Sequence, residues 1–472
     1  MLFNSLAFLL FFPIVCIVYY LLPVTYTRAR NLFLLAASYF FYMWNTPAYA
    51  FILLGCTVVT YFSAILLERL ETEKARKWCL IGNIILNISV LVFFKYFHFI
   101  TDNTVALLHH VGIPCAVPGL EILLPVGISF YIFQALGYTI DVYRRRTPAE
   151  RDFPTYALFV SFFPQLVAGP IERSYRLLPQ FREQHTLEYD NVAAGARMMV
   201  WGYFLKLVLA DRCALYVDSI FNNVPYHNGG SFLLATLLFT FQIYGDFAGY
   251  SLIAIGTARI LGFRLMENFQ RPYFADSLTD FWRRWHISLS SWFKDYLYFP
   301  LGGSRVGPLR RSFNLFITFL ISGLWHGASW TFICWGALHG IVIVVEKFFH
   351  NLGKPSSTLL RVLRCLLTFV LVALLWVLFR ANNLSDALTV YSGIFTQPGL
   401  PFLQEVGVGN VAAALVAIFI VTIKDLSDER RWSLHIAASP HAWVRYVYFA
   451  LMVAIITLFG VLGSDQFIYF QF

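Results

Sequence analysis

The sequence predicts an all-α polytopic membrane protein, a helical bundle of about 11–12 spans with additional re-entrant segments. Hydrophobic residues make up 58% of its 472 residues and charged residues only 13%, whereas about a quarter of the residues are charged in an average soluble domain. Apolar runs of about 20 residues, enough for a helix to cross a bilayer, recur along the whole chain. We therefore expect residues 1–472 to form a single membrane domain.

Three broad features narrow the class of protein further. The first apolar run, at 6–22, is predicted to be a span rather than a signal peptide, because no basic region precedes it and no small-residue cleavage site follows it. The seven cysteines are odd in number and show no C-x-x-C spacing, which predicts neither a disulfide framework nor a metal site. The net charge of +9 comes from Lys and Arg scattered in short loops. This pattern favours contact with membrane lipid over a nucleic-acid partner.

Positive charge in the connecting loops predicts the orientation of the spans. The basic loops at 28–30, 68–77, 144–151 and 424–431 should face the cytoplasm, and the loops near Asn45, Pro114 and Asn222 should face outward. An even number of crossings then places both termini outside. The predicted spans are 6–22, 31–44, 49–67, 79–97, 120–141, 197–218, 232–261, 311–330, 331–348, 358–379, 409–424 and 443–463.

Two stretches do not fit simple spans. Residues 156–170 are apolar but too short and bounded by proline, and residues 281–311 mix tryptophans with five arginines and a lysine. We interpret both as re-entrant or interfacial segments, because irregular backbone at membrane depth persists only where protein or water satisfies its polar groups.

A histidine lies inside an apolar run, in GLWHGASW at 323–330. A polar side chain at membrane depth is costly, so His326 should face the bundle interior or a cavity. Gly323 and Gly327 flank it and leave room for a neighbouring helix or a ligand to approach. By position alone, a neutral histidine hydrogen-bonded between helices is as good an interpretation as a catalytic one.

A second histidine, His286, lies in FWRRWHISLSSWFKDYLYFPLGGSR at 281–305. Aromatic and basic residues alternate there, which is typical of an interfacial helix with its rings among lipid headgroups. The alternative is a cationic mouth that attracts a phosphate-bearing donor such as coenzyme A or a phosphopantetheine carrier. The segment alone does not separate the two. In the second interpretation the donor-binding residues are Arg283, Arg284, Trp285 and Lys294.

Two further motifs place polar groups in apolar surroundings. In FQIYGDFAGYS at 241–251, Asp246 is either a buried structural acceptor or a wall of a reaction chamber. We favour the structural role, because a buried carboxylate needs donors and the neighbouring Tyr and Gln side chains supply them. In SFFPQLVAGPIERS at 161–174, prolines and a glycine break any helix and Gln165 adds a polar group, which indicates a lining loop.

Five motifs in order resemble the membrane-bound O-acyltransferase (MBOAT) family, in the branch of alginate O-acetylation, peptidoglycan O-acetylation and teichoic-acid D-alanylation proteins. They are GISFYIFQALGYTIDVYR (127–144), SFFPQLVAGPIER (161–173), FQIYGDFAGYS (241–251), FWRRWHISLSSWFKDYLYFPLGGSR (281–305) and GLWHGASWTFICWGALHG (323–340). The resemblance spans nearly the whole chain, so residues 1–472 are expected to be one MBOAT domain.

The resemblance implies a central tunnel, closed by re-entrant segments, with His326 as the catalytic histidine and His286 as the second polar residue across the chamber. A histidine can take a proton from a hydroxyl that attacks a thioester, because its unperturbed pKa lies near operating pH. We expect no bound cofactor. The donor substrate would be acetyl coenzyme A, another acyl coenzyme A or an acyl carrier. The tunnel-lining residues are predicted to be Gln165, Gln242, Tyr244, Asp246 and Trp325.

The implied activity is O-acyl transfer, with acetyl as the expected group, from a cytosolic thioester across a bacterial inner membrane. A cell-envelope polysaccharide would be the indirect acceptor, and a separate extracytoplasmic acyltransferase of the SGNH type the implied partner. D-alanyl transfer from a carrier protein to teichoic acid is an alternative within the family. A transporter is an alternative from another class, because transporters also bury polar groups in broken helices, but the chain has no internal repeat.

The tail at 465–472 ends in FIYFQF. An aromatic belt that anchors the last helix at the interface is the ordinary explanation of such an ending. The ending also resembles the C-terminal motif of related O-acetyltransferases and of an accessory peptide of D-alanylation, in which a tyrosine is implicated as an acyl relay. That resemblance assigns the relay to Tyr469. A phenol could accept the acyl group and pass it on as a reactive aryl ester.

Overall fold

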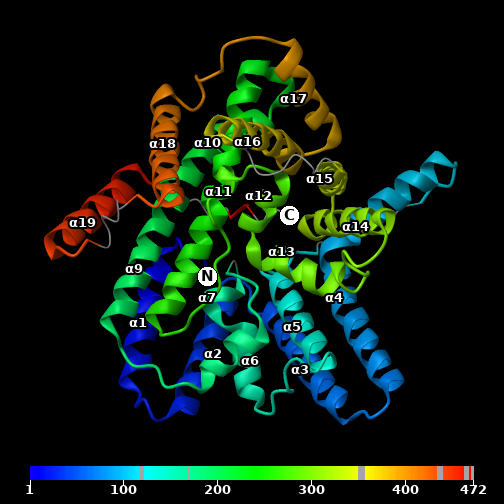
Figure 1. Cartoon of the computed structure of the whole chain (residues 1–472), viewed down its shortest axis with the longest axis vertical. Helices are drawn as coiled ribbons and strands as arrows, with labels where there is room; N and C mark the ends of the chain where they lie inside the picture. The colour runs from blue at the N-terminus through cyan, green and yellow to red at the C-terminus, as the bar shows by residue number, and fades with distance from the viewer. Residues whose placement is uncertain (116–121, 168, 349–356, 433–438, 462–466, 469–472) are drawn as a thin grey trace. The chain divides into compact units, whose positions relative to one another are not determined.

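The computed structural model describes residues 1–115, 122–167, 169–348, 357–432, 439–461 and 467–468. Every regular element in these ranges is a helix (Figure 1). The helices pack as two compact units: unit 1 comprises residues 1–193 and 257–266, and unit 2 comprises residues 194–256 and 267–472. The expectation of one MBOAT domain stays a prediction.

Unit 1 is built from the N-terminal helices. They are α1 (Leu6–Leu21), α2 (Thr27–Met43), α3 (Tyr49–Arg69), α4 (Glu73–His110), α5 (Ile128–Tyr143) and the short helices α6 (Phe153–Ser161), α7 (Phe163–Leu166) and α8 (Ser174–Leu177). Helix α9 (Tyr189–Tyr203) begins in unit 1 and continues into unit 2.

Unit 2 holds the histidine motifs. Helix α9 runs through a π-helical turn at Phe204–Ala210 into α10 (Asp211–Phe221). The remaining helices are α11 (Gly229–Ile260), α12 (Leu278–Arg284), α13 (Ile287–Phe293), α14 (Pro308–His326), α15 (Trp330–Phe348), α16 (Thr358–Arg380), α17 (Leu384–Thr396), α18 (Val408–Arg430) and α19 (Ala442–Phe459).

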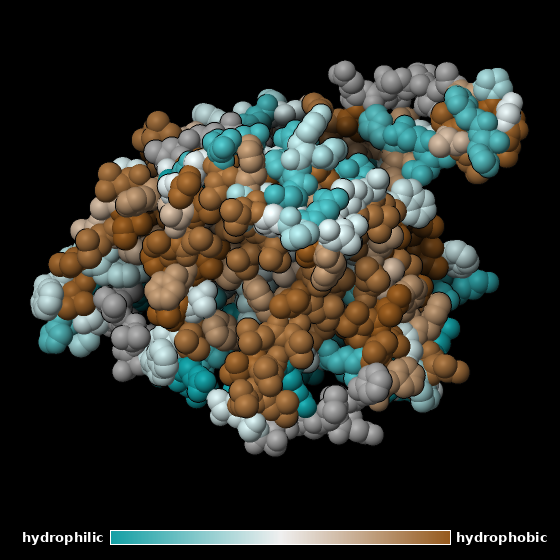
Figure 2. Space-filling view, turned by 90° about the horizontal axis from the view of Figure 1, so that it is seen from above, coloured by the Kyte–Doolittle hydropathy of each residue, from teal (hydrophilic) through white to brown (hydrophobic). Residues whose placement is uncertain are grey.

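The structure confirms the predicted all-α polytopic membrane protein. Each of the twelve predicted spans coincides with a helix, and in the described ranges eight helices are long and apolar enough to cross a bilayer. The eight are α3, α4, the continuous helix 189–221, α11, α15, α16, α18 and α19. Large apolar side chains face outward on many helices, such as Leu10, Ile14 and Ile17 of α1, and Figure 2 shows hydrophobic side chains across much of one face. Such surface is stable only against lipid or another protein.

The structure differs from the predicted elements in several places. Helix α4 runs from Glu73 to His110 rather than over 79–97, so that part of the predicted loop 68–77 is helical. Helix α5 begins at Ile128 rather than near 120, because Pro125 precedes Gly127, which has a left-handed backbone (φ 75°) and caps the helix. The basic segment at 424–431 is not a loop but the last turns of α18. Helix α17 was not predicted. Asn383 caps its N-terminus by accepting a hydrogen bond from the Asp386 backbone N–H.

Ion pairs in unit 1 show where its basic loops lie, which the predicted orientation of the spans depends on. Ion pairs join Arg28 to Asp152 at 3.8 Å and Arg145 to Glu73 at 3.9 Å, and Arg151 pairs with Glu68. The three basic loops of this unit therefore lie at one end of it, as a common cytoplasmic side requires.

Both stretches that did not fit simple spans are broken helices. In unit 1, α6 ends at Ser161 and α7 begins at Phe163, and the side chains from 155 to 167 are buried in protein. In unit 2, α12 and α13 are two seven-residue helices separated by Trp285 and His286, and a π-helical turn at Lys294–Tyr298 follows. The second stretch ends where α14 begins, at Pro308, rather than at 311.

Candidate active site

His326 is the last residue of α14, and its side chain is buried, with 4% of its surface exposed. Three aromatic rings surround the imidazole, each with its centroid 5.0–5.2 Å away: Trp325 of α14, Trp335 of α15 and Phe379 of α16. Each of these rings makes an interplanar angle of 72–83° with the imidazole, which is an edge-to-face arrangement. The imidazole thus lies in an apolar cage from three helices, where little water competes for its nitrogens.

Close packing of α14 on α15 holds this cage in place. At Gly323, an added methyl group would come within 3.0 Å of the Cα of Gly336 and would meet the carbonyl of Phe332. At Gly327, it would meet the ring of Phe332. Of the two occupants predicted for the space beside Gly323 and Gly327, a neighbouring helix or a ligand, the structure has the helix, because α15 fills that space.

His286 occupies the turn between α12 and α13 and is fully buried. Its backbone is left-handed (φ 43°, ψ 54°), a conformation that histidine adopts more readily than most residues. Asn268 fixes the turn: its carbonyl accepts from the Ile287 N–H at 3.0 Å, and its side-chain oxygen accepts from the Ser288 hydroxyl at 2.6 Å. Burial lowers the pKa of His286, which lies outside the candidate spans, to about 3, so its imidazole is neutral at neutral pH.

A row of rings joins the two histidines to the C-terminal tail. The ring of Trp325 lies 5.0 Å from His326 and 6.1 Å from His286. Phe247 of α11 also lies beside His286, at 4.6 Å, and Phe467 of the tail lies 6.1 Å from Phe247. Three distant motifs and the tail therefore meet at one site within unit 2.

Asp246 lies beside the tail, buried at 3% exposure on α11. One carboxylate oxygen pairs with Lys206 Nζ at 2.6 Å, and the other accepts the backbone N–H of Ile468 at 2.7 Å. The structural role favoured for Asp246 is supported, but the expected donors were wrong. A lysine and a main-chain amide, neither of them from motif 241–251, satisfy this carboxylate.

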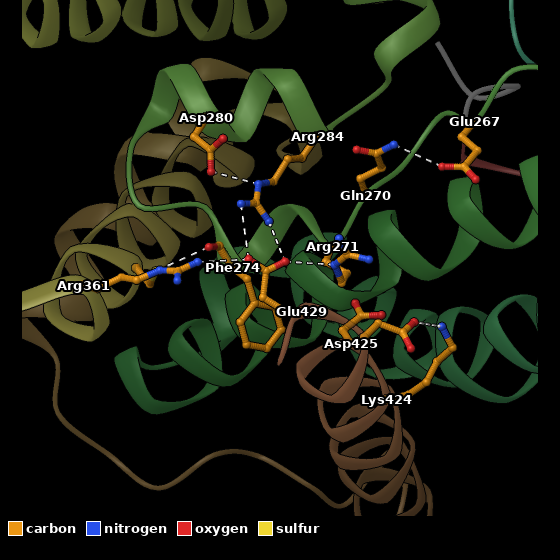
Figure 3. A network of polar contacts seen from close by, with 12 residues as sticks. Glu267, Gln270, Arg271, Phe274, Asp280, Arg284, Arg361, Lys424, Asp425 and Glu429 are labelled. Atoms are coloured by element: carbon orange, nitrogen blue, oxygen red, sulfur yellow. Dashed lines mark hydrogen bonds and ion pairs between the residues drawn. The ribbon is translucent and has the colours of Figure 1, made fainter. Parts of the chain in front are cut away.

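The predicted donor-binding residues divide into two pairs. Trp285 is buried and stacks on Phe281 at 5.4 Å, and Arg284 pairs with Asp280 at 2.8 Å and with Glu429 at 3.0 Å. Figure 3 shows Arg284 between these carboxylates, with Arg271 and Arg361 also directed at Glu429. Arg283 and Lys294, in contrast, are exposed. Arg283 and Lys294 are therefore better placed to meet a phosphate than Arg284 or Trp285.

The other residues that were predicted to line the tunnel differ from one another in their contacts. Tyr244 is buried, and its hydroxyl donates to Asp425 at 2.9 Å. Gln242 is buried, and its side-chain oxygen has no hydrogen-bond partner in the described part of the chain. Gln165 belongs to unit 1, where its side-chain nitrogen donates to the carbonyl of Phe159 at 2.7 Å. The lining role of all five residues stays a prediction.

Several residues of the site were not singled out from the sequence. Lys206 lies in the middle of the predicted span 197–218, where an ionisable residue is itself a signal. His339 is fully buried on α15 and accepts a hydrogen bond from Trp282 Nε1 at 3.2 Å. Tyr469, the predicted relay, lies outside the described residues. Among those described, no group of three or more His, Cys, Asp or Glu side chains could hold a metal ion, and all seven cysteines are free thiols.

The fold is that of a polytopic membrane protein, and unit 2 buries both histidines that were predicted for the site. The model of the membrane-bound O-acyltransferase family, MBOAT, matches residues 120–385, which include both histidines. The chain therefore belongs to the MBOAT family, and it is a multi-pass membrane O-acyltransferase.

Its relatives agree with the branch predicted from the motifs. The chain is 41% identical to a probable alginate O-acetylase, AlgI, of Pseudomonas syringae pv. tomato, over 90% of this chain and 81% of the relative. It is 37% identical to a peptidoglycan O-acetyltransferase of Helicobacter pylori, over 84% and 80%. It is 26% identical to a teichoic acid D-alanyltransferase of Bacillus subtilis, over 52% and 65%. The likeness to the two O-acetylating proteins is higher and covers more of the chain.

Proposed function

We propose that this protein transfers acetyl groups from a cytosolic thioester, across the inner membrane, toward oxygen atoms of a cell-envelope polysaccharide. The observation that carries the proposal is the site of unit 2, in which His326 and His286 are both buried and both lie beside the ring of Trp325. Relatives named for O-acetylation, similar over most of the chain, support acetyl as the group and a polysaccharide as the acceptor.

His326 is proposed as the general base of the transfer. It removes the proton from an acceptor hydroxyl, whose oxygen forms a bond to the thioester carbonyl carbon as the C–S bond breaks. The proton then passes to the departing thiolate. A positioned base of this kind typically contributes about 10²- to 10⁴-fold to the rate. The apolar cage keeps water from taking the place of the acceptor.

His286 is proposed to orient the donor or to polarise its carbonyl. A neutral imidazole can donate one hydrogen bond toward a developing oxyanion, and the burial that lowers its pKa keeps it neutral. The fixed turn around Asn268 holds the ring in place without help from substrate.

The path of the acyl group completes the proposal. The acetyl group would pass from the cytosolic donor to the outer side through a tunnel, and Tyr469 would accept it there as an aryl ester. A separate SGNH-type acyltransferase outside the membrane would then move it to the polysaccharide. The described end of the tail, Phe467 and Ile468, is buried in unit 2. This placement supports a tail that reaches the site rather than one that only anchors the last helix.

D-alanyl transfer from a carrier protein is the second candidate, favoured by the relatives named for teichoic-acid D-alanylation. Purified protein should be incubated with labelled acetyl coenzyme A and, separately, with a D-alanyl carrier protein. We expect label from the acetyl donor to be transferred by the wild type and not by His326→Ala. Transfer from the carrier protein alone would replace the first candidate with the second. Equal transfer by wild type and His326→Ala would show that His326 is not the base.

A further inference from the structure

The end of the chain is fixed to unit 2 at two places. Near the end of α19, the backbone N–H of Val461 donates to the Leu207 carbonyl at 3.0 Å, and Arg212 Nε donates to the Phe459 carbonyl at 3.0 Å. Farther along, the N–H of Ile468 donates to Asp246 at 2.7 Å. Phe467 and Ile468 have only 0% and 3% of their surfaces exposed. Phe467 and Ile468 therefore pack as part of the core.

A buried charged triad supports the second attachment. Lys206 Nζ lies 2.7 Å from Asp211 and 2.6 Å from Asp246, and all three side chains are 5% exposed or less. Lys206 and Asp211 come from the π-helical turn and the start of α10, and Asp246 comes from α11. Burying three charges is expensive and gains little stability over apolar residues of similar size. Their presence here calls for a use other than stability.

We propose that Asp246, held by Lys206, is a positioning residue that fixes Phe467 and Ile468 of the C-terminal tail beside the histidine site. The amide of Ile468 is the group that it binds, and Phe467 fills the space beside it, with its ring 4.3 Å from Tyr250 and 6.1 Å from Phe247. Phe247 in turn contacts His286 at 4.6 Å. The inference rests on the proposed function, in which the residue that follows Ile468 receives the acyl group.

The charge of Lys206 explains why a carboxylate is needed at 246. A carboxylate offers one oxygen to the ammonium and the other to the amide. An asparagine has a single oxygen, and the ammonium, as the stronger donor, would take it and leave the amide of Ile468 facing an NH₂ group. Asp246→Asn should therefore keep the size of the side chain and the contact with Lys206 but release the tail.

Hydrogen–deuterium exchange of the full-length protein in detergent tests the attachment. In Asp246→Asn we expect the Ile468 amide to exchange at least about tenfold faster than in the wild type, as befits a lost bond to a charged acceptor. Peptides from α14 and α15 should exchange at wild-type rates, which checks that the fold is intact. Asp425→Asn is the matched control, because Asp425 is a buried aspartate that binds Tyr244 rather than the tail. Unchanged exchange at Ile468 in Asp246→Asn overturns the proposal.

Kinetics separate positioning from general structure. Asp246→Asn should lower kcat for acetyl transfer from the donor at an unchanged donor KM. Ile468→Pro, which lacks the amide proton, should lower kcat at least tenfold more than Ile468→Val, and it decides the matter if Asp246→Asn does not fold. Faster exchange with wild-type kcat, or equal effects of the two Ile468 variants, overturns the positioning role. If wild-type protein transfers no acyl group at all, the proposed function fails, and the exchange experiment still tests the attachment.

Discussion

Arg284 and Arg283 are neighbours in the sequence, but they differ in what surrounds them. Arg284 has 19% of its side chain exposed and is paired with Asp280 and Glu429, whereas Arg283 is exposed. Replacing one partner of a fully buried ion pair costs about 3–5 kcal/mol, and an exposed pair is worth at most about 1 kcal/mol. Glu429 keeps Arg271 and Arg361 when Arg284 is removed. We therefore expect Arg284→Ala to lower the free energy of unfolding by about 2 kcal/mol.

Arg283→Ala should change that free energy by less than about 0.5 kcal/mol, because an exposed side chain away from special contacts contributes little. If Arg283 meets the phosphates of the donor, its removal should raise the donor KM more than it lowers kcat, and added salt should weaken the same contact. Lys294→Ala should behave like Arg283→Ala, since Lys294 is also exposed.

The assay combines thermal unfolding in detergent with acetyl-transfer kinetics on the same three preparations. A fall of several degrees in the unfolding midpoint is expected for Arg284→Ala alone. The reasoning is refuted if Arg284→Ala unfolds at the wild-type temperature and raises the donor KM more than Arg283→Ala does. Arg284 would then bind the donor, and its pairing with Glu429 would have to open during binding.

Four further outcomes are expected. Tyr469→Phe should express normally and lose polysaccharide acetylation, since it keeps the ring and lacks the hydroxyl, and full activity would leave only the anchoring role. His286→Ala should lower kcat by at least about tenfold, and unchanged kcat with unchanged donor KM would support a purely interfacial helix. Gly336→Ala should cost about 1–3 kcal/mol in unfolding experiments, because the added methyl meets the Phe319 carbonyl, and a wild-type midpoint would contradict the close packing of α14 on α15. Burial raises the pKa of Glu172 from 4.5 to about 7. The free energy of unfolding should therefore be highest below pH 4.5 and should fall by roughly 3 kcal/mol as the pH rises to 7. Glu172→Gln should lack this fall when unfolding midpoints are compared between pH 5 and 8.

The sequence by itself determined the class of fold and pointed to two histidines as the centre of the proposed site. Twelve apolar runs predicted twelve helices, because a bilayer allows few other structures and the length of a helix that crosses it is fixed. His326 is conspicuous because a polar group in apolar surroundings is costly, and the resemblance of the motifs to the MBOAT family assigned His326 and His286 to the site. Both are buried in the structure, and the same ring, that of Trp325, lies beside each.

Only the tertiary structure decided which charged residues are already paired and where the tail lies. The sequence gives no sign that Glu429, about 145 residues from Arg284, faces it, because the pairing depends on how α18 packs beside α12. From the sequence, hydrogen-bond donors for Asp246 were expected only within its own motif. Packing instead brings Lys206 and the amide of Ile468 to Asp246 from 40 and 222 residues away. A polar residue within an apolar stretch of sequence shows that burying this residue is costly. The partner that offsets this cost is chosen by contacts between distant segments, which exist only after the helices have packed.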